Sequence, residues 1–135
     1  MAMRNKPAER HPRRLVLLVD DDSRVRESLK DLLGSAGVET LSFSSGEALL
    51  RSDVLATSSC LITDVRMPGM DGWELQALVA KTHPHVPIIF ISAFQDSQAF
   101  ERALVLGAFA FLYKPFDGEE LLRTVEAALS RSAGL

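Results

Sequence analysis

The most constraining feature of the chain is a regular alternation between short apolar runs and longer amphipathic stretches. Leu15–Val19 is a run of consecutive apolar residues that is too short for a helix and typical of a strand buried on both faces. From Ser23 to Ala36, apolar residues recur at helical spacing, and Gly37 is a typical helix stop. This pattern of strand then helix repeats along the chain. It predicts right-handed βαβ crossovers and a parallel sheet covered by helices on both faces.

The other predicted strand and helix pairs follow in order. The predicted strands span Val38–Phe43, Cys60–Asp64, Val86–Ile91 and Ala108–Tyr113. The predicted helices run to about Arg51 after a capping-box pattern at Ser44–Glu47, then over Gly72–Lys81, Asp96–Leu106 and Asp117–Ser130. Ser52–Ser59 is predicted to be a weak, polar connection.

Composition indicates one self-sufficient domain. With 135 residues, of which 47% are hydrophobic, the chain can close a core without a metal or a disulfide. The single cysteine, Cys60, cannot form an internal disulfide, and its place in an apolar run favours an inert core thiol and a reducing, cytoplasmic compartment. No apolar stretch approaches the length of a membrane span and no signal-peptide pattern is present, so we expect no membrane contact.

Charge is unevenly distributed. Five of the 15 basic residues precede Leu15, opposed there by Glu9 alone, and the remainder has 10 basic and 17 acidic residues. We therefore expect residues 1–13 to be a disordered basic tail, residues 14–132 to be the folded domain, and residues 133–135 to be a tail or the start of a linker. The acidic balance of the folded part argues against direct contact of this domain with nucleic acid.

Polar side chains stand where the predicted strands end. Asp20 and Asp21 follow the first strand, Asp64 ends the third, Ser92 follows the fourth and Lys114 follows the fifth. Because the carboxyl ends of parallel strands meet at one edge of a sheet, we expect these groups to converge in one shallow cleft. Clustered carboxylates repel unless a cation shares the site, and a hard divalent ion such as Mg²⁺ is the natural occupant.

Four separated motifs, taken together, suggest a family. Val19–Asp22, Asp64–Gly72, Ser92–Ala93 and Lys114–Phe116 resemble the receiver domain of two-component response regulators, and the resemblance covers Arg14 to about Ser132. It implies a flavodoxin-like (βα)5 three-layer sandwich with strand order 2-1-3-4-5. It also implies a bacterial phosphorelay protein that catalyses its own phosphorylation and dephosphorylation without being a conventional enzyme.

The resemblance assigns roles to individual residues. Asp64 would accept the phosphoryl group, and Asp20, Asp21, Asp64 and the backbone carbonyl of Arg66 would hold Mg²⁺. Ser92 would hydrogen-bond to the phosphoryl group.

Further implications concern the end of the fifth strand and the partners. Lys114 would pair with the phosphoryl group, and the Lys114–Pro115 peptide would be cis. Phe111 matches the switch aromatic of the family, although a plain core role for it stays open. The implied partners are a sensor histidine kinase or a phosphotransfer protein. A homodimer through the fourth helix, fifth strand and fifth helix is a further implication.

The residues bear on three other functions. A phosphatase or phosphotransferase of the haloacid dehalogenase type would want a second acid two residues after Asp64, where Arg66 stands. A flavin or nucleotide binder would want a glycine- or hydroxyl-rich loop after the first strand, where Asp20–Asp22 would repel a phosphate. A pseudo-receiver that binds proteins without ever taking a phosphoryl group stays open as the alternative function.

Overall fold

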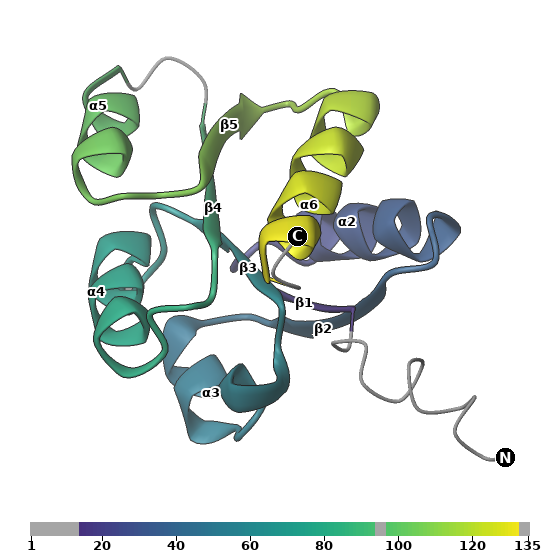
Figure 1. The fold of residues 1–135 in the computed structure, drawn as a ribbon. Coiled ribbons are helices and arrows are strands. Elements are labelled where there is room, and N and C mark those ends of the chain that lie inside the picture. Colours follow the sequence, from purple (N-terminus) through teal and green to yellow (C-terminus); the bar gives the residue numbers. More distant parts are fainter. Residues whose placement is uncertain (1–13, 94–96, 133–135) are drawn as a thin grey trace, which may run out of the picture.

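The fold is a parallel sheet between two layers of helices (Figure 1). The computed structural model describes residues 14–93 and 97–132, so the predicted tails at residues 1–13 and 133–135 lie outside the described residues. The strands are β1 (Leu15–Val19), β2 (Glu39–Phe43), β3 (Cys60–Asp64), β4 (Ile88–Ala93) and β5 (Ala110–Lys114). Their order, β2-β1-β3-β4-β5 with every pairing parallel, confirms the predicted flavodoxin-like α/β sandwich.

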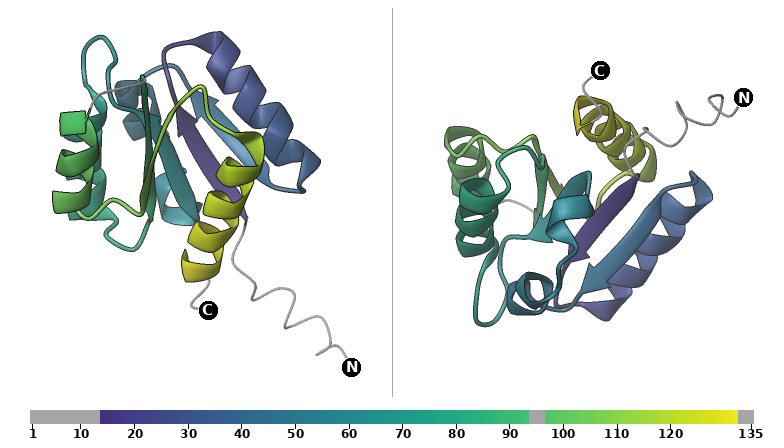
Figure 2. Two further views of the ribbon diagram at one scale, coloured as in Figure 1. Left: turned by 90° about the horizontal axis from the view of Figure 1, so that it is seen from above. Right: turned by 60° about the horizontal axis from the view of Figure 1, so that its bottom comes forward.

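Helices cover both faces of the sheet, as the two views of Figure 2 show. The helices are α2 (Ser23–Ser35), α3 (Gly46–Arg51), α4 (Gly72–Thr82), α5 (Ser97–Val105) and α6 (Gly118–Ser132). Alternate residues of β1 face opposite cores: Leu15 and Leu17 pack with α3, α4 and α5, whereas Val16 and Leu18 pack with α2 and α6. Among the described residues, none of these helices has the length and apolar character needed to cross a membrane.

Three strands, β2, β4 and β5, begin one or two residues later than the apolar pattern predicted, and the end of the preceding helix accounts for β2 and β5. After α2, Gly37 has a φ of 79° and the N–H of Val38 reaches back to the Leu33 carbonyl at 3.0 Å. After α5, Gly107 has a φ of 81° and the N–H of Ala108 reaches the Ala103 carbonyl at 3.0 Å. Both arrangements are Schellman motifs, which use the residue after glycine to close the helix. That residue is therefore not free to open the next strand.

One local prediction between β2 and β3 was wrong. The N-cap of α3 is Ser45, whose Oγ accepts from the N–H of Ala48 at 3.1 Å, so the predicted capping box beginning at Ser44 does not form. The connection from Ser52 to Ser59 also contains a 3₁₀ turn, η2 (Leu55–Thr57). Leu55 is buried in the core beneath α3, and this burial orders part of an otherwise polar connection.

Candidate functional site

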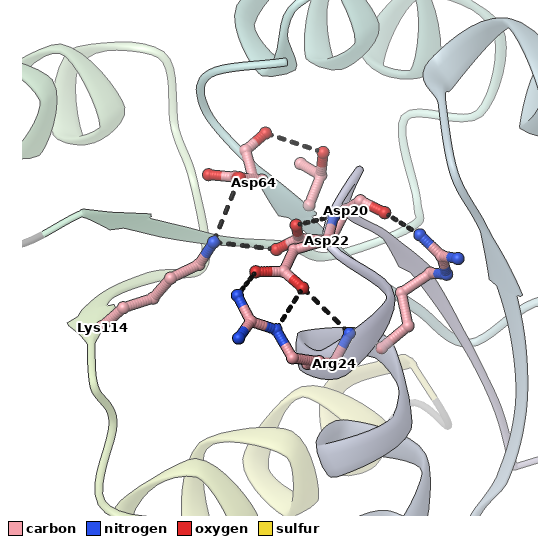
Figure 3. Close-up of polar contacts among 7 residues, drawn as sticks. Asp20, Asp22, Arg24, Asp64 and Lys114 are labelled. Atoms are coloured by element: carbon pink, nitrogen blue, oxygen red, sulfur yellow. Dashed lines mark hydrogen bonds and ion pairs between the residues drawn. The ribbon is translucent and has the colours of Figure 1, made fainter.

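The structure brings Asp20, Asp64 and Lys114 together at the carboxyl edge of the sheet (Figure 3). Asp20 follows β1, Asp64 ends β3 and Lys114 ends β5. The Nζ atom of Lys114 lies 2.9 Å from Asp20 Oδ2 and 3.1 Å from Asp64 Oδ2. The side chains of Asp20 and Asp64 are only 1% and 9% exposed, and that of Lys114 is 25% exposed. One partly accessible ammonium group therefore bridges two nearly buried carboxylates.

Three carboxylates form a cluster with the dimensions of a cation site. One carboxylate oxygen from each of Asp20, Asp21 and Asp64 lies within 4.8 Å of the other two. Ligands on opposite sides of an octahedral Mg²⁺ lie about 4.2 Å apart, given bond lengths of about 2.1 Å. Asp21 is exposed, whereas Asp20 and Asp64 are buried. The all-oxygen donor set suits a hard divalent ion and could hold one.

The environment of Asp64 and Lys114 shifts the pKa values of both groups. Burial raises the pKa of Asp64 above its usual value, and the neighbouring Asp20 raises it further, whereas Lys114 and the backbone N–H of Arg66 only partly oppose the rise. For Lys114, burial acts to lower the pKa, but the hydrogen bond to Asp20 and the charges of Asp64 and Asp20 outweigh it. The net pKa of Lys114 is therefore raised, and its ammonium form is secured.

Asp20 is held in place by the turn that opens α2 (Figure 3). Its Oδ1 accepts from the N–H of Asp22 at 2.9 Å, and its carbonyl accepts from Arg26 Nη1 at 2.7 Å. Asp22 is the N-cap of α2, accepting from the N–H of Arg24 at 2.9 Å, and this hydrogen bond lowers the pKa of Asp22. The third acid of the run therefore caps the helix, and the sequence prediction had left it out of the metal site.

Ser92 lies on β4 beside this cluster and is fully buried. Its Oγ atom has no hydrogen-bond partner among the described residues. Buried hydroxyl groups are nearly always paired, because leaving one unpaired costs free energy. An oxygen-rich ligand at the strand ends would satisfy it.

Phe111 occupies the side of β5 that faces α5. Its ring makes edge-to-face contacts with Phe100, at a centroid distance of 5.8 Å, and with Tyr113, at 5.1 Å. The next residue, Leu112, packs in the opposite core with α2 and α6, as strand alternation predicts. Phe111 is half-buried, with its neighbour Phe100 exposed on α5.

The loop after Asp64 is fixed by its own backbone. The N–H of Gly72 donates to the Val65 carbonyl at 2.8 Å, and a Cβ atom at Gly72 would lie 2.3 Å from the Asp64 carbonyl oxygen. Asp71 and Glu74 form a reciprocal capping box that starts α4, with both hydrogen bonds at 2.9 Å. The Asp-x-x-Glu spacing could have predicted this cap from the sequence, but Asp71 was interpreted only as part of the turn that ends the preceding strand. The side chain of Arg66 is exposed, and the Lys114–Pro115 peptide is cis.

Comparison with known proteins identifies the family. The response regulator receiver domain model matches residues 16–126. The chain belongs to the response regulator receiver domain family. It is 42% identical over 117 residues to nodulation protein W of Bradyrhizobium diazoefficiens, an alignment that covers 87% of this chain and 52% of that protein. It is 40% identical over 118 residues to the DNA-binding transcriptional regulator NtrC of Escherichia coli, covering 87% of this chain and 25% of NtrC. This receiver domain thus spans about half the length of one relative and a quarter of the other.

Solved structures agree with this assignment. A response regulator receiver domain protein from Clostridium thermocellum superimposes with a TM-score of 0.82 at 29% identity, over 87% of this chain and 94% of that one. The crystal structure of FixJ-N superimposes with a TM-score of 0.77 at 31% identity, over 86% of this chain and 93% of that one. The receiver fold is therefore confirmed from structure as well as from sequence.

Proposed function

We propose that this receiver domain accepts a phosphoryl group on Asp64 within a bacterial two-component system. The observation that carries the proposal is the position of Lys114 Nζ, which lies 3.1 Å from the Asp64 carboxylate and 2.9 Å from that of Asp20. A carboxylate reacts poorly with a phosphoryl group chiefly because both are negatively charged, so the site needs cations more than a base. Lys114 supplies one such cation from the chain itself.

In the proposed reaction, a carboxylate oxygen of Asp64 attacks the phosphorus of a phosphohistidine on a kinase or phosphotransfer protein. A phosphorus–oxygen bond forms, the phosphorus–nitrogen bond breaks, and the released imidazole takes a proton from solvent. Asp20, Asp21, Asp64 and the Arg66 carbonyl would hold Mg²⁺, which neutralises charge on the phosphoryl oxygens when bound. Lys114 would then pair with the phosphoryl group in place of the bare carboxylate.

Ser92 and Phe111 would link the phosphoryl group to a partner. The unpaired hydroxyl of Ser92 would move to donate a hydrogen bond to a phosphoryl oxygen. The movement of Ser92 would free space for Phe111 to turn inward beside β5. The face made by α5, β5 and α6 would change as a result and would bind a partner or a second copy of the domain. We propose that residues 14–132 form the receiver domain and that its partners are cytoplasmic.

The test is phosphorylation by a small donor. With acetyl phosphate and Mg²⁺, the intact mass of the wild-type protein should rise by one phosphoryl group. Asp64→Asn should abolish the increase, and the control Asp31→Asn, which removes an exposed carboxylate from α2, should leave it unchanged. Equal labelling of wild type and Asp64→Asn would refute the assignment, and no labelling of either would favour a pseudo-receiver.

A further inference from the structure

The loop between β3 and α4 is also held from outside, by α3. Glu47 Oε2 accepts a hydrogen bond from the backbone N–H of Met70 at 3.1 Å, a contact that joins residues 23 positions apart. Glu47 is partly buried and lies in the first turn of α3. The cap of that helix is made by Ser45 alone, so the carboxylate of Glu47 is committed to the loop rather than to its own helix.

Glycines allow the two segments to come this close. Gly69 has a φ of 74°, and a Cβ atom there would lie 2.9 Å from Glu47 Oε2. On the other side of the contact, a Cβ atom at Gly46 would lie 3.0 Å from Met70 Sδ. The first turn of α3 and the turn at Gly69–Met70 therefore fit against each other with no room for further side-chain atoms.

The loop that Glu47 holds is the one that carries part of the proposed metal site. It begins at Asp64, continues through Arg66, and closes where the N–H of Gly72 meets the Val65 carbonyl at 2.8 Å. The Gly72 contact and the Asp71 cap fix the end of the loop nearest α4. Glu47 fixes its tip, midway between Arg66 and the helix. Side chains that orient metal-binding groups from outside the ligand set commonly change metal affinity when they are removed.

We propose that Glu47 is a positioning residue for the metal site, acting by holding the Asp64–Gly72 loop in one conformation before the cation binds. This proposal rests on the proposed function, because it concerns the same Mg²⁺ site. It predicts that the hydrogen bond to Met70, rather than the negative charge of Glu47, is what the site requires.

The test is calorimetric titration of the full chain with MgCl₂. Glu47→Ala should weaken Mg²⁺ binding about tenfold, at the low end of the range for such outer partners. Glu47→Gln removes the charge but keeps an oxygen acceptor of the same reach, so its affinity should stay within about twofold of wild type. Glu47→Asp keeps the charge but shortens the side chain, so it should resemble Glu47→Ala. The matched control, Asp53→Ala, removes an exposed carboxylate just beyond the other end of α3 and should bind normally.

A second readout follows the contact itself. In metal-free protein, hydrogen exchange at the Met70 amide should be faster in Glu47→Ala and Glu47→Asp than in wild type, and near wild type in Glu47→Gln. If Glu47→Gln lost as much Mg²⁺ affinity as Glu47→Ala, the site would require the negative charge of Glu47 rather than its hydrogen bond, and the proposal would be overturned. Unchanged affinity in Glu47→Ala would also overturn it while leaving the proposed function intact. Absence of Mg²⁺ binding in the wild type would instead refute the metal site and with it the proposed role of Glu47.

Discussion

The carboxyl edge of β3 and the neighbouring surface of β5 and α5 are built very differently. Every residue of β3 is buried, and the loop that follows it is tied to Ile91 of β4, to α3 and to the start of α4. In β5 only Leu112 is fully buried, and α5 leaves Leu104 61% and Val105 86% exposed. The first region fixes the position of one carboxylate from several directions, whereas the second keeps aromatic and aliphatic groups near the surface.

This difference matches what each region would do in the proposed function. Phosphoryl transfer needs groups held in one geometry, since small displacements of reacting atoms are costly. A readout surface needs an element with two arrangements, and such elements come from the less stable parts of a fold. In the proposed function, chemistry and output would thus lie in adjacent regions, one tightly packed and one exposed. Substitutions in the two regions test this contrast, from the largest expected effect to the smallest.

Gly72→Ala should damage the fixed region most. The added Cβ would lie 2.3 Å from the Asp64 carbonyl oxygen, so the backbone must shift. We expect the free energy of unfolding, measured in urea, to fall by about 3 kcal/mol, the upper end of the usual cost of overpacking. The control is Gly34→Ala in α2, where a Cβ meets nothing within 4 Å. It should stabilise the protein by about 0.5–1 kcal/mol through helix propensity. Similar losses in both variants would contradict the account.

Lys114→Ala should leave two nearly buried carboxylates without their cation. We expect a loss of about 2 kcal/mol of unfolding free energy at pH 7 in chelator, less than for a fully buried pair because Lys114 is 25% exposed. The pKa of Lys114 is raised by its carboxylate partners, so its contribution is complete below the ordinary lysine pKa and is lost as the pH rises through the raised value. A loss that persists undiminished at high pH would show that the effect is not ionic.

Asp64→Asn should stabilise the metal-free protein, although it destroys the proposed acceptor. Burial and Asp20 raise the pKa of Asp64, so its charged form is disfavoured in the fold. We expect a gain on the order of 1 kcal/mol at pH 7 in chelator, a typical size for one substitution. The wild type should recover the difference as the pH falls from above the raised pKa towards the ordinary aspartate value, because the folded state binds the extra proton there. Denaturation in chelator across this pH range tests both expectations.

Val105→Ser should have the smallest effect. The side chain is 86% exposed on α5, so we expect a change in unfolding free energy below about 0.5 kcal/mol. The rate of labelling by acetyl phosphate should also be unchanged, since Val105 is the last residue of α5, at the end of the helix that leads to the start of β5 rather than to the carboxyl edge of the sheet. A large loss of stability would show that the α5 surface is more tightly packed than the contrast requires.

The sequence predicted the polar residues at the carboxyl edge of the sheet more completely than it predicted the contacts that hold them in place. Apolar runs that end in Asp20, Asp64 and Lys114 located the site, because strand direction alone places those residues at one edge. The hydrogen bond from Met70 to Glu47 could not be predicted, since it depends on how α3 packs against a loop 23 residues away. The capping-box pattern at Ser44–Glu47 favoured a role for Glu47 in capping its own helix. Only the tertiary contact shows that Glu47 binds the loop instead.

The strand starts show a second limit of local patterns. Val38 and Ala108 are apolar residues beside strands, yet each completes a helix end through a backbone hydrogen bond at 3.0 Å. Apolar character does not distinguish these two uses, because both bury the side chain. Phe111 is similar: alternation placed it on the correct face of β5, but its half-buried state depends on Phe100 and Tyr113.

The most direct test of the central claim identifies the carboxylate that is modified. After incubation with acetyl phosphate and Mg²⁺, borohydride reduces an aspartyl phosphate to homoserine, which peptide mass spectrometry can locate. We predict homoserine at Asp64 alone, dependent on Mg²⁺, with Asp20 and Asp21 unchanged. Homoserine at Asp20 or Asp21 in place of Asp64, or none at any of the three, would contradict the account.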